Sequence, residues 1–401
     1  MKLRFEIEKF PFDEGFLPQG MDRQIKRLPF ILESHSESSS RLRQMLDPGA
    51  RELLRAYYEK GGYASTPLGN GEYALRQGRE VFQVIDSSMR DAGKRWADSD
   101  VLEIGSSYGY LLHCAKEAGA KSVLGVEPGD EGNIGSQKYG IPYLQDFFPS
   151  DKLDSEFDVI CTHCVLEHIE EIEPFVAAMI ERLKPGGLLF AAVPDCEGKL
   201  GIGDISIVSH QHVNYFTSES FRELLEDAGL GRVTVASSAE RSILYAWGVK
   251  ADADNTAAVR VREHSEIETG FDLLALFALA YRRNIGTLQR IIRETRKAGG
   301  SIGFYGISPV LCGLLTDFGF APRLFDGDAA KHGTFIAGCD SPVESPERLI
   351  ANPVDKLLVC PVDYDREIRV WLGKSGFSAD RVISLLELFE HSSGRNYHRS
   401  R

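Results

Sequence analysis

The middle of the chain alternates between short apolar runs and segments of helix length. The runs are VLEIG, SVLGVEP, FDVICTH and GLLFAAVP, all between residues 101 and 194. Short runs that are apolar throughout are typical of parallel strands covered by helices on both faces. The pattern therefore predicts an α/β fold, with a doubly wound Rossmann-like core over residues 99–245.

A second alternation of the same kind begins at Ser301. It contains SIGFYG, PRLFDGD, KLLVCPV and RVISL, separated by helix-like segments. This pattern predicts a second, smaller Rossmann-like domain over residues 300–390. Between the two α/β units, apolar residues at helical spacing predict an amphipathic helix within a linker over residues 246–299.

The two ends of the chain carry weaker patterns. Residues 1–98 begin with the strand-like alternation KLRFEIEKF and then resemble broken helix from Asp47 onward. We expect this N-terminal region to cover the substrate or to act as a lid. Residues 391–401 are expected to be a frayed tail.

Composition narrows the class of protein. The 401 residues include 46 Lys and Arg against 59 Asp and Glu, and the net charge of −13 argues against broad binding to nucleic acid or anionic membranes. The longest apolar run, Leu273 to Tyr281, is too short for a bilayer, which needs about 20 residues. The first residues lack the features of a signal peptide, so we expect a cytoplasmic location. The seven dispersed cysteines are expected to be reduced thiols.

The turn after the first core strand carries the strongest chemical pattern. Gly105 and Gly109 open the turn into a helix, and Gly105 allows the backbone to pass close to a ligand. A dinucleotide fold would have a glycine at Ser107. Glu103, in the strand, would repel a diphosphate and favour a cationic ligand such as the ammonium of a methionine-derived group.

Two further segments carry residues that could bind other parts of the same ligand. Glu127 follows the second strand, where a carboxylate can accept both hydroxyls of a ribose. Asp146 can accept from an exocyclic amine, and Phe147 can lie against an adenine face. Together with the cationic tail at Glu103, these residues describe S-adenosylmethionine.

The motifs EIGSSYG, VEP, QDFF, FDVICTHCVLEHI and LKPGGLLFAAVPD resemble those of class I S-adenosylmethionine-dependent methyltransferases, in the same order. The resemblance covers about residues 99–245 and implies that S-adenosyl-L-methionine is the cofactor. The alternative is an α/β domain without this cofactor. Carried over by motif, the expected cofactor-binding residues are Glu103, Gly105, Ser106, Gly109, Glu127, Pro128, Asp146, Phe147, His163 and Cys164.

A looser resemblance extends to the nucleotide-sugar C-methyltransferases. Their third domain implies that the C-terminal unit helps to hold a nucleotide-linked sugar, with Gly306, Ser308 and Asp326 as candidate substrate residues. Tyr63, in the GGYASTPLGNGEY loop, could close over the site or serve as a packing anchor. These residues predict a small-molecule substrate, and a homodimer is left open.

One departure concerns zinc, because this family usually has paired cysteines in an N-terminal zinc domain and residues 1–98 contain none. The pair Cys161 and Cys164 lacks a second pair, so a tetrahedral zinc site is not expected there. We therefore expect no bound metal.

Three histidines are candidates for the proton transfer that methylation requires. His212 occupies the position at which the resemblance places the base, within a Tyr-x-Glu-His arrangement, but here Ser209 and Gln211 replace the tyrosine and the acid. If the segment is extended, His210 points the same way as His212. The pair could instead bind a metal or donate structural hydrogen bonds. His168 follows the fourth strand and could face the methyl group, or merely cap and pack.

The sequence thus predicts a methyltransferase that acts on a nucleotide-linked sugar, at carbon or at oxygen. One alternative is O-methylation of an unrelated small metabolite. Another is a scaffold that binds S-adenosylmethionine without catalysis.

Overall fold

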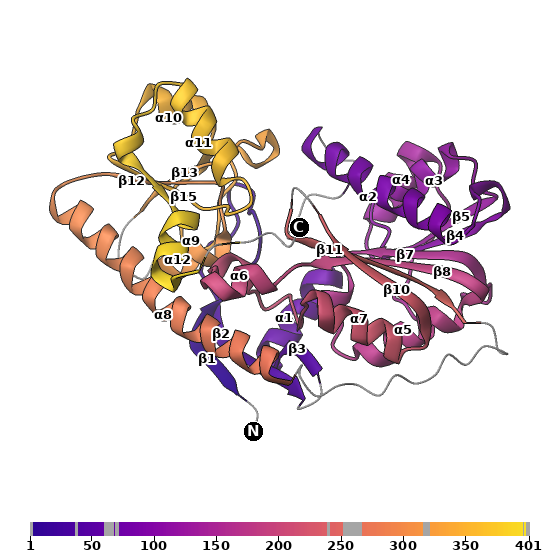
Figure 1. The fold of residues 1–401 in the computed structure, drawn as a ribbon. Helices are drawn as coiled ribbons and strands as arrows, with labels where there is room; N and C mark the ends of the chain where they lie inside the picture. Colours follow the sequence, from indigo (N-terminus) through magenta and orange to yellow (C-terminus); the bar gives the residue numbers. More distant parts are fainter. Residues whose placement is uncertain are drawn as a thin grey trace.

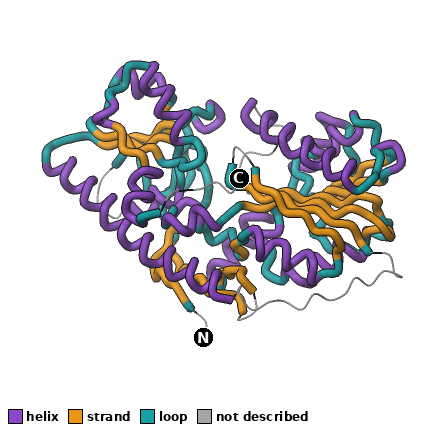
Figure 2. The backbone as a smooth tube through the Cα atoms, in the orientation of Figure 1, coloured by secondary structure: helices purple, strands orange, loops and turns teal. Residues whose placement is uncertain are grey.

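The protein is described here by a computed structural model, which covers residues 3–36, 39–59, 68, 72–238, 241–251, 267–315, 321–395 and 397. These residues form three sheets with helices packed around them (Figures 1 and 2). The predicted Tyr63 lies outside the described residues.

The largest sheet is the predicted Rossmann-like core. Its seven strands have the order β10-β11-β8-β7-β4-β5-β6. The five strands from β4 to β8 pair in parallel, whereas β11 is antiparallel to both of its neighbours. The strands are β4 (Asp100–Ile104), β5 (Ser122–Val126), β6 (Tyr143–Leu144), β7 (Phe157–His163), β8 (Leu183–Pro194), β10 (Leu230–Ser237) and β11 (Ile243–Lys250). Their helices are α2 (Glu72–Asp91), α3 (Tyr110–Glu117), α4 (Glu131–Tyr139), α5 (Ile172–Glu181) and α7 (Ser218–Asp227), with the short turns η1 (Trp96–Asp98) and η2 (Leu166–His168).

The strand order of this sheet reverses at β4. From β4 the chain proceeds to β5 and β6 on one side, and then returns to place β7 and β8 on the other side. In open α/β sheets, ligands bind beyond the carboxyl ends of the strands at such a switch point. A ligand is therefore expected at the loops that follow β4, β5 and β7.

The N-terminal region forms a separate antiparallel sheet. It contains β1 (Arg4–Pro11), β2 (Arg27–Ser36), β3 (Ser39–Gln44) and, from the segment between β8 and α7, β9 (Asn214–Tyr215). In the chain, β3 is followed by α1 (Pro48–Glu59). Ion pairs hold this region against the core: Arg51 lies 2.5 Å from Glu170 and Arg43 lies 3.6 Å from Glu171. The N-terminal region is thus joined to the segment that carries the candidate histidines.

The C-terminal sheet is parallel throughout and has the order β14-β13-β12-β15-β16. Its strands are β12 (Ile302–Tyr305), β13 (Arg323–Phe325), β14 (Val343–Glu344), β15 (Lys356–Val359) and β16 (Val382–Ser384). The accompanying helices are α9 (Pro309–Leu315), α10 (Pro346–Ala351), α11 (Asp365–Lys374) and α12 (Leu385–Ser393), with η6 (Ala329–Lys331) and η7 (Ala379–Arg381). This sheet is the second Rossmann-like unit that the sequence predicts.

The long helix α8 (Ile267–Lys297) is part of a hydrophobic core. Leu274, Phe277 and Leu288 on α8 are fully buried. They belong to one apolar cluster with residues of the N-terminal sheet, of the C-terminal sheet, and of α6 (Glu197–Ile202) and η3 (Ile205–Ile207). In Figure 1, α8 runs from the C-terminal unit down past β1 and β2. The segment predicted as a linker therefore packs the two outer sheets together.

The described residues near the chain end contact the rest of the protein. α12 continues to Ser393, and the Tyr397 hydroxyl donates to Asp363 Oδ1 at 2.8 Å. Residues 391–393 of the predicted tail therefore belong to α12, and the frayed end expected over residues 391–401 stays a prediction.

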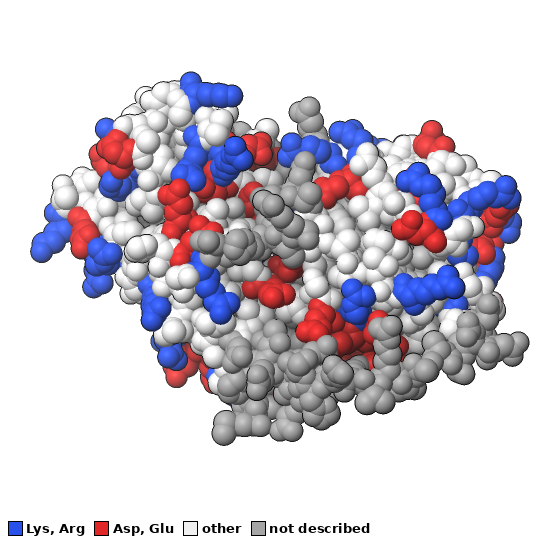
Figure 3. Space-filling model, viewed as in Figure 1, with Lys and Arg blue, Asp and Glu red and all other residues white. Residues whose placement is uncertain are grey.

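The described residues also show the state of the cysteines, the character of the helices and the distribution of surface charge. All seven cysteines are free thiols, as the dispersed pattern predicts. None of the helices in the described part of the chain has the length and apolar character needed to cross a membrane. On the face shown in Figure 3, acidic and basic side chains are interspersed.

Candidate active site

The glycine turn after β4 has the backbone conformation that the sequence predicts. Gly105 has φ +70° and Gly109 has φ +66°, in the left-handed region that favours glycine. A Cβ added at Gly105 would lie 2.4 Å from the Val165 side chain. The packing of the β7 loop against the turn therefore requires a glycine here, and the approach of a ligand to Gly105 stays a prediction.

Glu127 holds the turn from the neighbouring strand. Its carboxylate accepts from the Ser107 amide at 2.8 Å and from the Gly129 amide at 2.9 Å. The side chain is buried, with 1% exposed. The structure thus places this carboxylate directly beside the glycine turn.

Glu103 is a buried acid beneath the same turn. Its side chain is 3% exposed, and Oε2 has no hydrogen-bond partner among the described residues. Burial raises the pKa of Glu103 well above its ordinary value, and the negative charge of Glu127 raises it further. A buried acceptor of this kind requires a donor or a cation.

These observations test whether the turn fits S-adenosylmethionine. The cofactor's ammonium would supply the donor that Glu103 Oε2 lacks, and its ribose hydroxyls would donate to Glu127. A diphosphate would bring negative charge to two buried acids. The residues present therefore fit the expected cofactor and disfavour a dinucleotide.

The predicted adenine-binding residues lie on the loop after β6. Asp146 accepts from the Ser150 hydroxyl at 2.8 Å and pairs with Lys152 at 3.0 Å, and the bond to Lys152 is the largest cause of its lowered pKa. The Phe147 ring is 57% exposed. The exposed Phe147 ring can stack on an adenine beside the Asp146 carboxylate. The assignment of these two residues to adenine binding stays a prediction.

Four further residues were expected at the cofactor by motif alone. Ser106 is buried and packs closely against β5. A Cβ added at Gly125 on that strand would lie only 2.4 Å from Ser106 Oγ. Pro128 follows Glu127 directly and is half-buried. Burial lowers the pKa of His163 to about 4, and Cys164 has a left-handed φ of +54° and a thiol pKa raised by burial. These positions line the carboxyl ends of β4, β5 and β7.

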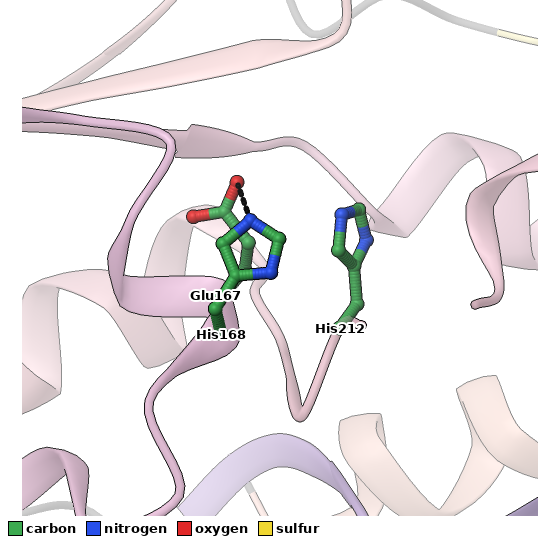
Figure 4. A group of neighbouring side chains, drawn as sticks. All are labelled: Glu167, His168 and His212. Atoms are coloured by element: carbon green, nitrogen blue, oxygen red, sulfur yellow. Dashed lines mark ion pairs between the residues drawn. The ribbon is translucent and has the colours of Figure 1, made fainter. Parts of the chain in front are cut away.

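The structure brings His168 and His212 together, although they come from different segments. Their ring centroids are 5.1 Å apart at an interplanar angle of 67°. His168 Nδ1 donates to the Gln211 carbonyl at 2.8 Å, since a carbonyl can only accept. Figure 4 shows both rings beside Glu167, a residue that the sequence reasoning did not single out although it lies within the quoted LEHI motif.

His210 points elsewhere, because residues 209–212 form a turn in which the His212 amide donates to Ser209 O. The expectation that His210 and His212 share a face is therefore wrong. His210 is fully buried, its Nε2 bonds to the Pro29 carbonyl at 3.2 Å, and its ring contacts Phe10, Phe12 and Phe30. The His210 side chain therefore packs against the N-terminal region, and it is not a metal-binding partner for His212.

The candidate substrate residues of the C-terminal unit follow β12 and β13. Gly306 has φ +71°, and a Cβ there would lie 2.2 Å from Pro361. The Ser308 hydroxyl accepts from the Leu311 amide at 3.3 Å at the start of α9. Asp326 accepts from the Ile307 amide at 3.3 Å and pairs with Lys331 at 3.0 Å. All three thus shape the loops at the carboxyl edge of this sheet.

Comparison with known proteins supports the prediction that the central domain is a methyltransferase domain. Residues 75–235 match the family described as "Methyltransferase domain". The chain is 23% identical over 346 residues to C-methyltransferase NovU of Streptomyces niveus, covering 82% of this chain and 78% of NovU. It is 32% identical over 100 residues to the ubiquinone biosynthesis O-methyltransferase of Rhizobium etli, covering 23% of this chain and 40% of that protein.

Among solved structures, the magnesium protoporphyrin IX methyltransferase of Synechocystis with bound SAH is 16% identical. That comparison covers 50% of this chain and all of the other, with a TM-score of 0.38. The family match and the α/β core, with its acids around a glycine turn, agree on one class of enzyme. Residues 75–235 therefore carry a methyltransferase domain of the S-adenosylmethionine-dependent class.

Proposed function

We propose that this methyltransferase acts on a nucleotide-linked sugar and that His212 accepts the proton of the methyl acceptor. The observation that carries the proposal is the extent of the likeness to C-methyltransferase NovU. An alignment over 82% of the chain cannot be contained within residues 75–235, so it includes segments outside the methyltransferase domain. The O-methyltransferase of Rhizobium etli matches only 23% of the chain.

The cofactor side of the proposed site consists of buried acids. S-adenosylmethionine, when bound, supplies a methyl group on a sulfonium that is already a good leaving group. Glu103 and Glu127 bind and orient the cofactor in this proposal, because both carboxyl groups are buried beside the glycine turn. The protein's remaining tasks are to position the acceptor and to remove its proton.

The proton side consists of the paired histidines. Burial lowers the pKa of His212 to about 3, and the charge of a protonated His168 would lower it further. The imidazole is therefore neutral at physiological pH and has a lone pair available. His168 is fixed by its bond to the Gln211 carbonyl, so it holds the His212 loop beside η2.

The C-terminal sheet offers the proposed place for the nucleotide. Its strand order reverses between β12 and β15, and the loops after these strands carry Gly306, Ser308 and Asp363. Lys199, on α6, lies 2.8 Å from Asp363 and joins this edge to the core. In α/β sheets such a switch point is the usual crevice for a ligand.

The test is incubation of the enzyme with S-adenosylmethionine and a panel of nucleotide sugars that includes 4-keto sugars. Mass spectrometry detects the added methyl group, and NMR locates it on carbon or oxygen. For a 4-keto sugar, heavy water without cofactor tests for exchange at the carbon beside the ketone. Methylation of free phenolic metabolites, with none on any nucleotide sugar, would contradict the proposal.

A further inference from the structure

Glu167, His168 and His212 form a compact group at the proposed acceptor site. Each residue offers one nitrogen or oxygen atom, and these atoms all lie within 4.8 Å of one another (Figure 4). Glu167 Oε1 lies 3.8 Å from His168 Nε2, which is too long for a hydrogen bond. The Glu167 side chain is 2% exposed, and its Oε2 has no hydrogen-bond partner among the residues described.

Hydrogen bonds to backbone carbonyls hold the group together. The Glu167 carbonyl accepts from the Val213 amide at 2.6 Å, and His168 Nδ1 donates to the Gln211 carbonyl. The Asn214 side chain donates from Nδ2 to two carbonyls of this turn, Leu166 at 3.2 Å and Ile169 at 2.7 Å. These bonds join η2 to the His212 loop. Because His168 Nδ1 carries its proton, the lone pair of Nε2 faces the Glu167 carboxyl group.

The His212 loop itself supplies no acid. In the family arrangement an acid precedes the base, but this chain has Gln211 there. The Gln211 side chain donates to the Asp13 carbonyl at 3.2 Å in the N-terminal region. The carboxyl group that lies within reach of both imidazoles comes instead from Glu167.

We propose that Glu167 is a positioning residue for the methyl transfer, and that its carboxylate compensates the positive charge that forms when His212 takes the acceptor's proton. The inference depends on the proposed function. In this step the acceptor's C–H or O–H bond breaks and a bond from that proton to an imidazole nitrogen forms. The electron pair left on the acceptor forms the bond to the methyl group, while the methyl–sulfur bond of S-adenosylmethionine would break and its electron pair would leave with sulfur in S-adenosylhomocysteine. The proton later leaves the imidazole to solvent.

The burial of Glu167 makes this role depend on pH. Burial raises the pKa of Glu167 to about 8, so the carboxyl group is mostly protonated at pH 6 and mostly ionised at pH 9. The activity that depends on the carboxylate should therefore increase as the pH rises through about 8. The titratable and charged groups that act on this cluster are Cys164, Cys196, His168, His212 and, from α6, Lys199.

The test compares Glu167→Gln with Glu167→Asp, which keeps the charge, and with Glu156→Gln, which changes an exposed acid. An opposite charge at this range typically shifts a pKa by about one to three units. At pH 9 we expect Glu167→Gln to lose about 10-fold or more in kcat, with unchanged S-adenosylhomocysteine affinity. At pH 6 its kcat should approach that of the wild type. Glu167→Asp should recover part of the loss, and Glu156→Gln should lose none.

A second measurement needs no acceptor. In protein labelled with ¹³C-histidine, signals assigned with His168→Gln and His212→Gln should shift with a midpoint near pH 8, and Glu167→Gln should abolish that step. The absence of the step in folded wild type overturns the inference even if the enzyme turns over sugars. The presence of the step would support the electrostatic interaction of Glu167 with the two histidines even if no nucleotide sugar is methylated. Stoichiometric Co²⁺ binding with visible absorption bands that vanish in Glu167→Gln would also overturn it, by making the three residues metal ligands.

Discussion

The Lys199 ammonium lies 2.8 Å from the Asp363 carboxylate and joins the methyltransferase core to the C-terminal sheet. Both side chains are mostly buried, with 14% and 12% exposed. Burial alone would raise the pKa of Asp363, but Lys199 and the hydroxyls of Ser242 and Tyr397 outweigh it and lower that pKa. The Asp363 carboxylate thus pairs with Lys199 through one oxygen and accepts hydrogen bonds from the two hydroxyls through the other.

We therefore expect Asp363→Asn to destabilise the protein strongly. Removal of one partner from a buried pair typically costs about 3–5 kcal/mol, because the other charge stays buried. The matched control is Glu294→Gln, which breaks the exposed pair with Arg290 and should cost less than about 1 kcal/mol. Urea unfolding measures the free energy of unfolding of both variants. An equal loss of stability in Asp363→Asn and Glu294→Gln would contradict this expectation.

Glu127→Ala should weaken cofactor binding far more than it slows turnover at saturation. The ribose hydroxyls would lose a charged acceptor, which typically contributes about 1.5–3 kcal/mol, or about 10-fold to 150-fold in affinity. Calorimetry with S-adenosylhomocysteine measures the effect, with Glu117→Ala on the exposed end of α3 as the control. Unchanged affinity in Glu127→Ala would remove this residue from the cofactor site.

Gly105→Ala should be much more damaging than Gly119→Ala. Both glycines have positive φ, at +70° and +91°, so both variants carry the backbone strain of about 1–2 kcal/mol. Only at Gly105 does the added Cβ meet a side chain, that of Val165, whereas nothing lies within 4 Å at Gly119. Thermal unfolding and cofactor binding test the difference. Val165→Ala should partly rescue Gly105→Ala, and no rescue would show that the clash is not the cause.

His212→Ala should reduce turnover by roughly 100-fold to 10,000-fold with little change in S-adenosylmethionine affinity. The reason is that the proposed cofactor-binding acids lie within β4 and directly after β5, whereas His212 lies on a loop after β8. Single-turnover rates and calorimetry separate the two effects. Full activity in His212→Ala would exclude it as the base for either a carbon or an oxygen acceptor.

His210 should make the protein less stable in acid. Burial lowers its pKa to about 4, below the unfolded value of about 6.5, so the unfolded state binds more protons between these values. Stability should therefore fall as the pH decreases below about 6.5, with a contribution from His210 of about 2 kcal/mol at pH 5. Urea unfolding of His210→Gln at pH 8 and pH 5 should show a smaller difference than in the wild type. An identical difference would assign the acid sensitivity to other groups.

Much of the fold could be predicted from local patterns. The runs VLEIG, SVLGVEP, FDVICTH and GLLFAAVP fall on β4, β5, β7 and β8. The amphipathic segment near Glu263 to Lys297 contains α8. The antiparallel pairing of β11 was not predicted, because periodicity shows that a strand is buried and not which neighbour it meets or in which direction.

For the candidate site, the local pattern sufficed where the residues lie close together in the chain. Gly105, Gly109, Glu103 and Glu127 lie within two adjacent βα units, so strand spacing alone brings them to one edge. The pattern failed at His210, because an extended segment was assumed and the chain turns there. A turn depends on partners that periodicity does not reveal, here the Pro29 carbonyl and three phenylalanine rings.

The amino-acid order alone therefore predicted an α/β core with acids around a glycine turn, because these features depend on short-range backbone geometry and burial, and the resemblance of its motifs implied a methyltransferase. Packing between distant segments decided the rest. It placed His168 beside His212, buried Glu167 next to both, and paired Lys199 with Asp363. The physical reason is that desolvation and charge pairing depend on which surfaces meet, and those surfaces form only when the three sheets pack together.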